Sequence, residues 1–90
     1  MTAPTTTLIT GAASGLGWSL ARAAFARGHG VILVDRDVDA LAEKHAELAA
    51  EDAHRVRHFA LDLTDGPALD RLIDAVTAGG RLDVLINNAG

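Results

Sequence analysis

The stretch LITGAASGLGWSL, residues 8–20, places three glycines and two alanines between a short apolar run and a helical pattern. Glycine loses more conformational freedom on folding than any other residue, so its use here needs a compensating reason. Gly11 suits a tight turn, Gly15 lets the backbone approach a ligand, and Gly17 lets the helix pack closely on the strand. The free N–H groups of the helix that follows favour an anion. The stretch therefore predicts a phosphate-binding loop between a strand and a helix.

Strand-like and helix-like segments alternate along the rest of the chain. Apolar runs predict strands at residues 6–10, 31–35 and 55–63, and a fourth strand with its exit at 82–90. The run at 31–35 shows no polar alternation, which is typical of a strand buried on both faces. Helical spacing fills the intervals, at residues 16–27, 36–52 and 64–80.

The spacing within the helical segments predicts which side chains face inward. In the first segment the residues at helical spacing are Leu16, Leu20, Ala23, Ala24 and Arg27. In the third segment the residues expected to face inward are Leu69, Leu72, Ile73 and Val76. Thr64 or Asp65 could cap the start of this third helix, with Pro67 in its first turn.

The alternation of strands and helices predicts βαβ units and one parallel sheet. Because such crossovers are right-handed in about 98 % of cases, the expected strand order is 3-2-1-4. The reversal after the third strand places the third helix on the opposite face from the first two and opens a crevice at the carboxyl ends of strands 1 and 4, where open α/β sheets bind ligands. We therefore expect one domain over residues 1–90, a Rossmann-type α/β fold with helices on both faces.

Asp35 ends the second predicted strand, 24 positions after Gly11. An acid at roughly 20 residues from the first glycine is typical of a residue that binds an adenosine ribose, because its carboxylate accepts the ribose hydroxyls. The alternative role for Asp35 is a helix cap. Trp18 follows the last glycine and no Gly-Lys-Ser/Thr is present there, which argues against a P-loop. A methyltransferase that binds adenosylmethionine stays an alternative on these residues.

Three motifs together resemble the short-chain dehydrogenase/reductase family. TGAASGLG at residues 10–17 matches its T-G-x-x-x-G-x-G loop, and NNAG at 87–90 matches its N-N-A-G motif. Between them, LDLTD at 61–65 is similar to the family's D-[VL]-T stretch. The motifs fall in order at the ends of strands 1, 3 and 4 and span nearly the whole chain, which favours this family over a methyltransferase.

The resemblance implies an oxidoreductase that transfers hydride between a nicotinamide cofactor and an alcohol or carbonyl substrate. It implies the following cofactor-binding residues: Gly11, Ser14, Gly15, Leu16, Gly17, Asp35, Arg36, Asp62, Leu63, Asn87, Ala89 and Gly90. Asn88 is expected to tie strands together instead. For the NNAG residues, a strand-end turn that only satisfies backbone groups is the alternative to direct contact.

The choice of cofactor depends on charge. Asp35 would repel the 2′-phosphate of NADP, and family members that prefer NADP typically carry a basic residue at the place of Asp35 or of Ser14, so the resemblance favours NAD. Arg36 is a competing feature, because it could stack on adenine or recruit a 2′-phosphate.

No catalytic residue is expected within the chain. The resemblance implies catalysis by the tyrosine of a Tyr-x-x-x-Lys pair, whereas this sequence has no tyrosine and its only lysine is Lys44, on a helix expected to face solvent. The resemblance also implies a Rossmann-type fold truncated after strand 4. The chain would then be the cofactor-binding half of an oxidoreductase that is a homo-oligomer when complete. A stand-alone, non-catalytic dinucleotide-binding module is the alternative. With strand 4 as an unprotected edge, we expect a chain that is marginally stable, self-associating or part of a larger protein.

Composition excludes several other classes. A net charge of −4 without a basic cluster argues against nucleic acid. The chain has no cysteine, and its apolar runs are shorter than the roughly 20 residues of a membrane span, so a cytoplasmic protein without membrane contact is expected. No metal site is expected, because no ligand spacing relates the four histidines, His29, His45, His54 and His58.

Overall fold

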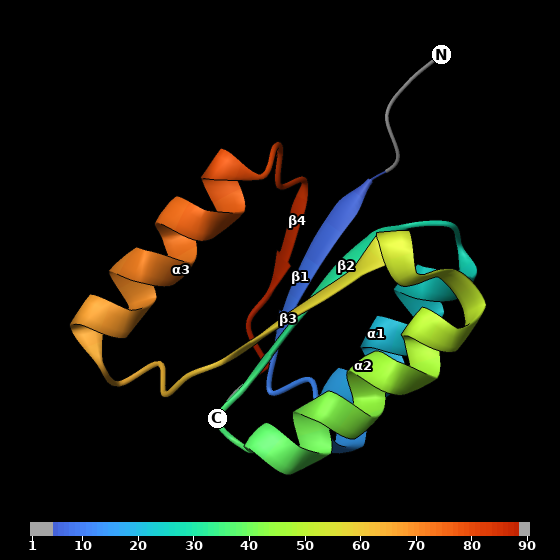
Figure 1. Cartoon of the computed structure of the whole chain (residues 1–90), viewed down its shortest axis with the longest axis horizontal. Coiled ribbons are helices and arrows are strands. Elements are labelled where there is room, and N and C mark those ends of the chain that lie inside the picture. The colour runs from blue at the N-terminus through green and yellow to red at the C-terminus, as the bar shows by residue number, and fades with distance from the viewer. Residues whose placement is uncertain (1–4, 89–90) are drawn as a thin grey trace.

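A computed structural model of the chain describes residues 5–88, with a parallel sheet between two layers of helices (Figure 1). The elements in chain order are β1 Thr6–Thr10, α1 Gly15–Ala26, β2 Gly30–Asp35, α2 Val38–Asp52, the 3-10 turn η1 Ala53–Arg55, β3 Val56–Ala60, α3 Gly66–Ala78 and β4 Val84–Ile86. Figure 1 shows α1 and α2 on one side of the sheet and α3 on the other. This is the arrangement that the right-handed crossovers predict.

The four strands lie in the order β3-β2-β1-β4 and all pairs are parallel, which confirms the predicted topology. In the register of the sheet Thr10 lies beside Val34, and Asp35 beside Ala60. The carboxyl ends of the strands therefore meet at one edge of the sheet. The chain steps outward from β1 through β2 to β3 and then crosses back to β4 on the other side of β1. A ligand crevice is expected between β1 and β4, where the direction reverses.

Two apolar clusters cover the two faces of the sheet. The larger lies under α1 and α2 and contains Ile9, Ala12, Ala13, Ala21, Ala24, Phe25, Val31, Leu33, Leu41, Leu48 and Val56. The smaller lies under α3 and contains Leu8, Ile32, Val34, Leu72 and Val76. Successive residues of β1 and β2 enter opposite clusters, which explains why their sequences show no polar alternation.

The buried face of α1 differs from the one that its larger side chains suggest. Gly17, Ala21, Ala24 and Phe25 are buried, whereas Leu16 is 65% exposed. Small residues on the inner face let the helix axis approach the sheet closely. The buried Gly17 and Ala21 directly follow Leu16 and Leu20, so the buried face is shifted by one residue from the face that carries these leucines. The pattern of leucines therefore gives the wrong face for the first turn of α1.

The inward face of α3 is narrower than predicted. Leu72 and Val76 are buried, but Leu69 is 37% exposed and Ile73 is 51% exposed. Within residues 5–88, α3 is the one helix on its face of the sheet, so no second helix covers the flank that carries Ile73. Asp65 caps α3 by accepting a hydrogen bond from the Ala68 N–H at 3.2 Å, as one of the two predicted alternatives.

Candidate functional site

The loop between β1 and α1 uses its glycines for two different reasons. Gly11 and Gly15 have φ angles of 64° and 58°, in the left-handed region that favours glycine. A Cβ on Gly17 would overlap the carbonyl oxygen of Gly11 and would lie 2.7 Å from the side-chain nitrogen of Asn88. The tight turn and the close helix packing expected of Gly11 and Gly17 are thus present. Around a Cβ on Gly15 there is open space within 4 Å.

The first turn of α1 presents free backbone donors next to this loop. Ser14 is the N-cap residue in an extended conformation with φ −157°, and its side chain makes no capping hydrogen bond in the described structure. The first N–H groups of a helix have no partner inside the helix and carry a partial positive charge. The start of α1, including Gly15 and Leu16, can therefore hold an anion.

Asp35 lies at the carboxyl end of β2 and contacts the glycine loop. Its Oδ2 atom accepts a hydrogen bond from the backbone N–H of Ala13 at 3.0 Å, and its Oδ1 atom accepts one from the N–H of Asp37 at 3.0 Å. Asp37, not Asp35, caps α2, by accepting from the N–H of Ala40 at 3.1 Å. The alternative of a helix cap for Asp35 is therefore wrong, and its half-buried carboxylate lies beside the loop.

Asp62 and Arg36 are polar residues in two loops at the same edge of the sheet. The Oδ1 atom of Asp62 accepts hydrogen bonds from the backbone N–H of Thr64 at 2.9 Å and from its hydroxyl at 2.7 Å. These bonds, and more weakly the positive charge of Arg36, lower the pKa of Asp62. Asp62 is therefore a carboxylate at neutral pH.

The end of β4 is tied to β1 and to the glycine loop. The backbone N–H of Asn88 donates to the Thr10 hydroxyl at 2.9 Å, and its side-chain amide donates to the Gly11 carbonyl at 3.4 Å. The hydroxyl of Thr10 donates to the side-chain oxygen of Asn87 at 3.1 Å. Asn88 thus has the tying role expected of it. Ala89 and Gly90 lie outside the described residues.

A cavity of about 880 Å³ opens at this edge of the sheet. The predicted site residues that line it are Gly11, Ser14, Asp35, Arg36, Asp62, Leu63 and Asn87. Gly15, Leu16 and Gly17 do not line the cavity and form the adjoining first turn of α1. The cavity continues beneath α3, where its walls are the side chains of Leu8, Val34, Leu72 and Ile73. One polar end and one apolar end suit a ligand with both kinds of surface.

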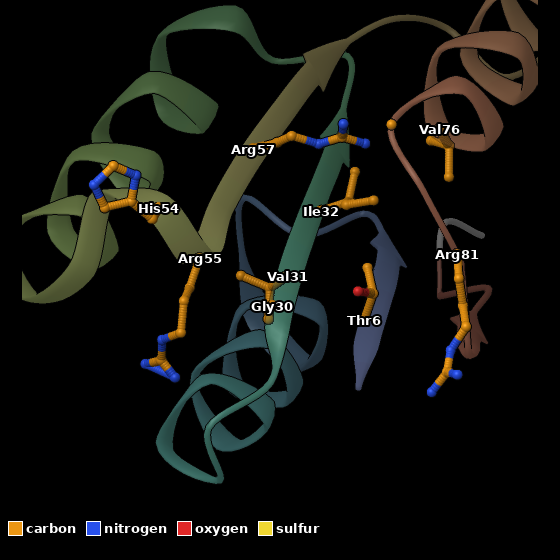
Figure 2. Close-up of a pocket in the computed structure, with 10 residues that line it drawn as sticks. Thr6, Gly30, Val31, Ile32, His54, Arg55, Arg57, Val76 and Arg81 are labelled. Atoms are coloured by element: carbon orange, nitrogen blue, oxygen red, sulfur yellow. The ribbon is translucent and has the colours of Figure 1, made fainter. Parts of the chain in front are cut away.

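A smaller cavity of about 200 Å³ lies at the amino ends of the strands (Figure 2). Three arginines line it, and two of them have structural partners. Arg55 donates to the Phe25 carbonyl at 3.0 Å, and Arg81 pairs with Asp83 at 2.6 Å. Figure 2 shows Arg57 reaching across β2, away from the head groups of Arg55 and Arg81, and its guanidinium lies next to Gly79 at the C-terminus of α3. Because the head groups do not converge, this cavity is not a candidate anion site.

The structure brings together two histidines that their sequence spacing does not relate. The Nδ1 atoms of His45 on α2 and His58 on β3 lie 2.8 Å apart. A sequence signal for this contact exists, because His58 is two positions after the buried Val56 and so faces α2. Among residues 5–88 no group of three or more potential metal ligands is found. None of the helices in that range is long and apolar enough to cross a membrane.

Comparisons with known proteins agree on one family. The family model described as short chain dehydrogenase matches residues 5–90. The chain is 48% identical over 85 residues to 1-deoxy-11-beta-hydroxypentalenate dehydrogenase of Streptomyces exfoliatus, covering 92% of this chain and 30% of that protein. It is 46% identical over 80 residues to (5R,7aS)-5-hydroxy-7a-methyl-1-oxo-2,3,5,6,7,7a-hexahydro-1H-indene-carboxyl-CoA reductase of Mycobacterium tuberculosis, covering 88% of this chain and 30% of that protein.

Solved structures show the same relationship. L-sorbose reductase from Gluconobacter frateurii, complexed with NADPH and L-sorbose, superimposes with a TM-score of 0.89 at 32% identity, covering 98% of this chain and 34% of that one. Menthone neomenthol reductase from Mentha piperita superimposes with a TM-score of 0.89 at 31% identity, covering 99% and 32%. The chain therefore spans about a third of the length of the proteins that it matches.

Proposed function

The chain belongs to the short-chain dehydrogenase family, and we propose that it forms the part of such an oxidoreductase that binds a nicotinamide dinucleotide. The observation that carries this proposal is the position of Asp35. Each of its carboxylate oxygens accepts one backbone N–H, from Ala13 and from Asp37. An ionised carboxylate has about four acceptor positions, so two remain for the vicinal hydroxyls of an adenosine ribose.

The neighbouring groups fit the rest of a dinucleotide. The pyrophosphate would lie against the glycine loop and the first turn of α1, whose first N–H groups have no partner inside the helix. Asp62 and Leu63 would meet the adenine edge, since both line the cavity. Asn87, with Ala89 and Gly90, would lie along the other side of the cofactor. The cavity beneath α3 would leave room for the remainder of the ligand.

We propose NAD rather than NADP as the cofactor. The carboxylates of Asp35 and Asp62 both line the cavity where a 2′-phosphate would lie, and Arg36 is the one cation among the residues that line it. Two negative charges against one positive charge disfavour a phosphate dianion. Some solved relatives are complexed with NADP or NADPH, so family membership alone does not select NAD. In this proposal the charges of Asp35, Asp62 and Arg36 decide between the two cofactors.

The proposed reaction is the interconversion of an alcohol and a carbonyl compound, for which a bound nicotinamide would accept or supply the hydride. The residues of this chain bind and orient the dinucleotide. They do not transfer a proton in this proposal, because the sequence has no tyrosine and the Lys44 ammonium lies 5.1 Å from the ring centroid of Trp18. Catalytic residues would come from outside the chain, and the chain alone would bind the cofactor without turnover.

Titration with NADH tests this proposal directly. Trp18, the single tryptophan, lies in α1 next to the glycine loop, so its emission reports on NADH by energy transfer. We expect saturable binding of NADH, weaker binding of NADPH and no competition by adenosylmethionine. A folded chain that binds none of the dinucleotides would overturn the proposal. Consumption of NADH by the chain alone, with a ketone or aldehyde added, would overturn the assignment of catalysis to other residues.

A further inference from the structure

His45 and His58 form an unusual contact on the side of the molecule covered by α2. Their Nδ1 atoms lie 2.8 Å apart, their ring centroids are 4.5 Å apart, and the ring planes are inclined by 72°. His45 comes from α2 and His58 from β3, and the two residues are 13 positions apart. Neither lines the cavity that would hold the dinucleotide. The proposed function therefore does not use this pair.

The contact places two nitrogen ligands at the spacing that one type of metal coordination needs. An imidazole nitrogen binds a first-row divalent ion at about 2.0 Å, so two nitrogens at a right angle about the ion are about 2.8 Å apart. Tetrahedral coordination, which Zn²⁺ adopts in proteins, needs a wider separation of about 3.3 Å. The observed 2.8 Å is the length of the hydrogen bond between the two rings, and it equals the separation of adjacent positions in tetragonal coordination. Cu²⁺ and Ni²⁺ prefer this geometry.

We propose that His45 and His58 together bind a divalent transition-metal ion in tetragonal coordination, with Cu²⁺ bound more tightly than Ni²⁺. The order of the two ions follows from the general ranking of affinities for nitrogen sites. Because residues 5–88 offer no third histidine or carboxylate at this place, water fills the other positions and the ion exchanges freely. The site is independent of dinucleotide binding.

The protonation state of the pair is compatible with metal binding. The hydrogen bond between the rings requires that one Nδ1 atom accepts through its lone pair, so at least one of the two rings is neutral. In the metal-free pair one Nδ1–H donates to the other Nδ1. When the ion binds, that proton moves to Nε2 of the same ring, and both Nδ1 lone pairs then bind the metal. The step breaks one N–H bond, forms another and needs no oxidant or reductant.

The site exists only in the folded chain, because it joins α2 to β3. An ion that binds the native state and not the unfolded state stabilises the protein in proportion to the logarithm of its concentration. Bound metal should therefore raise the temperature of unfolding. This consequence distinguishes a site built by the fold from scattered binding to single histidines.

Titration of the full chain, without an affinity tag, with CuCl₂ tests the proposal. The readouts are the copper electron paramagnetic resonance spectrum and the temperature of thermal unfolding. We expect one ion per chain, a spectrum of tetragonal copper with nitrogen ligands, and a raised unfolding temperature. His45→Gln and His58→Gln should each weaken binding by at least tenfold and abolish the thermal shift. His54→Gln is the matched control, since it removes one exposed histidine outside the pair and should bind like the original chain.

Three results would overturn the proposal. One is equal copper affinity in the His45→Gln, His58→Gln and His54→Gln variants. Another is a loss of binding in only one of the two paired variants, which would indicate a single-histidine site. The third is unchanged affinity in the chain unfolded by urea. Circular dichroism of each variant checks that the fold is retained, which the partial exposure of both histidines favours.

Discussion

The carboxylate of Asp35 accepts a hydrogen bond at 3.0 Å from the backbone N–H of Ala13, which joins the end of β2 to the loop that precedes α1. The second carboxylate oxygen accepts from the N–H of Asp37, at the start of α2. One side chain therefore holds together the loop and two helix starts around the candidate site. Asp35 also lines the cavity in which the proposed ribose would lie, and its carboxylate has acceptor positions left for it.

Substitution of Asp35 should separate its structural role from its binding role. Asp35→Ala removes all acceptors, and we expect NADH binding to weaken about tenfold to a hundredfold, as for a lost hydrogen bond to a charged group. Asp35→Asn keeps one acceptor but removes the charge, so it should bind NADPH better than the original chain does. Fluorescence titrations with both cofactors measure the two effects. Asp39→Asn, an exposed acid on α2, is the control. Unchanged affinities in both Asp35 variants would remove this residue from the site.

Gly17 should tolerate no side chain. An added Cβ would overlap the backbone carbonyl of Gly11, which cannot move without breaking the turn. We expect Gly17→Ala to lower the free energy of unfolding by about 1–3 kcal/mol or more, as is typical of overpacking. Gly66→Ala is the matched control, because Gly66 begins α3 with open space around its Cβ position. Urea unfolding of both variants measures the difference. Equal stability of the two would contradict the packing described for Gly17.

The topology was predictable because it depends on features that the sequence shows directly. Apolar runs such as residues 31–35 mark strands buried on both faces, and the glycine spacing from Gly11 to Gly17 marks the turn. Handedness then leaves few alternatives for the strand order. The position of Asp35 beside the loop follows from the same reasoning, since both lie at carboxyl ends of adjacent strands.

The details that were not predictable depend on tertiary packing. Leu16 is exposed although it continues a helical apolar pattern, because α1 packs through its glycine and alanines. Lys44 was expected to face solvent, yet its ammonium lies over the ring of Trp18, 5.1 Å from the centroid. The position of His58 two residues after Val56 indicates the face of the sheet on which it lies, but its contact with His45 also depends on the position of α2 along β3, which no local pattern specifies.

The stability of the chain should fall as the pH falls below about 6.5, the ordinary pKa of histidine. The folded-state pKa of His45 is lowered by burial and by His58, so in this range the unfolded chain binds more protons than the folded one. The loss begins as the unfolded-state histidine titrates and is complete below the folded-state pKa. Urea unfolding between pH 5 and 8, in the presence of a chelator, measures the slope. His45→Gln should flatten it, and His54→Gln should leave it unchanged; a slope equal in all three would contradict this origin.

Self-association should depend on the apolar edge formed by β4. In the described part of the chain β4 is an edge strand, with Leu85 62% exposed and the neighbouring Val84 39% exposed. Exposed edges with apolar side chains pair with other chains, and a lysine at such an edge opposes pairing. Sedimentation velocity should therefore show less association for Leu85→Lys than for the original chain. Val38→Lys is the control, since Val38 is 63% exposed at the start of α2, away from this edge. If both lysine variants reduced association equally, net charge rather than the β4 edge would be the cause.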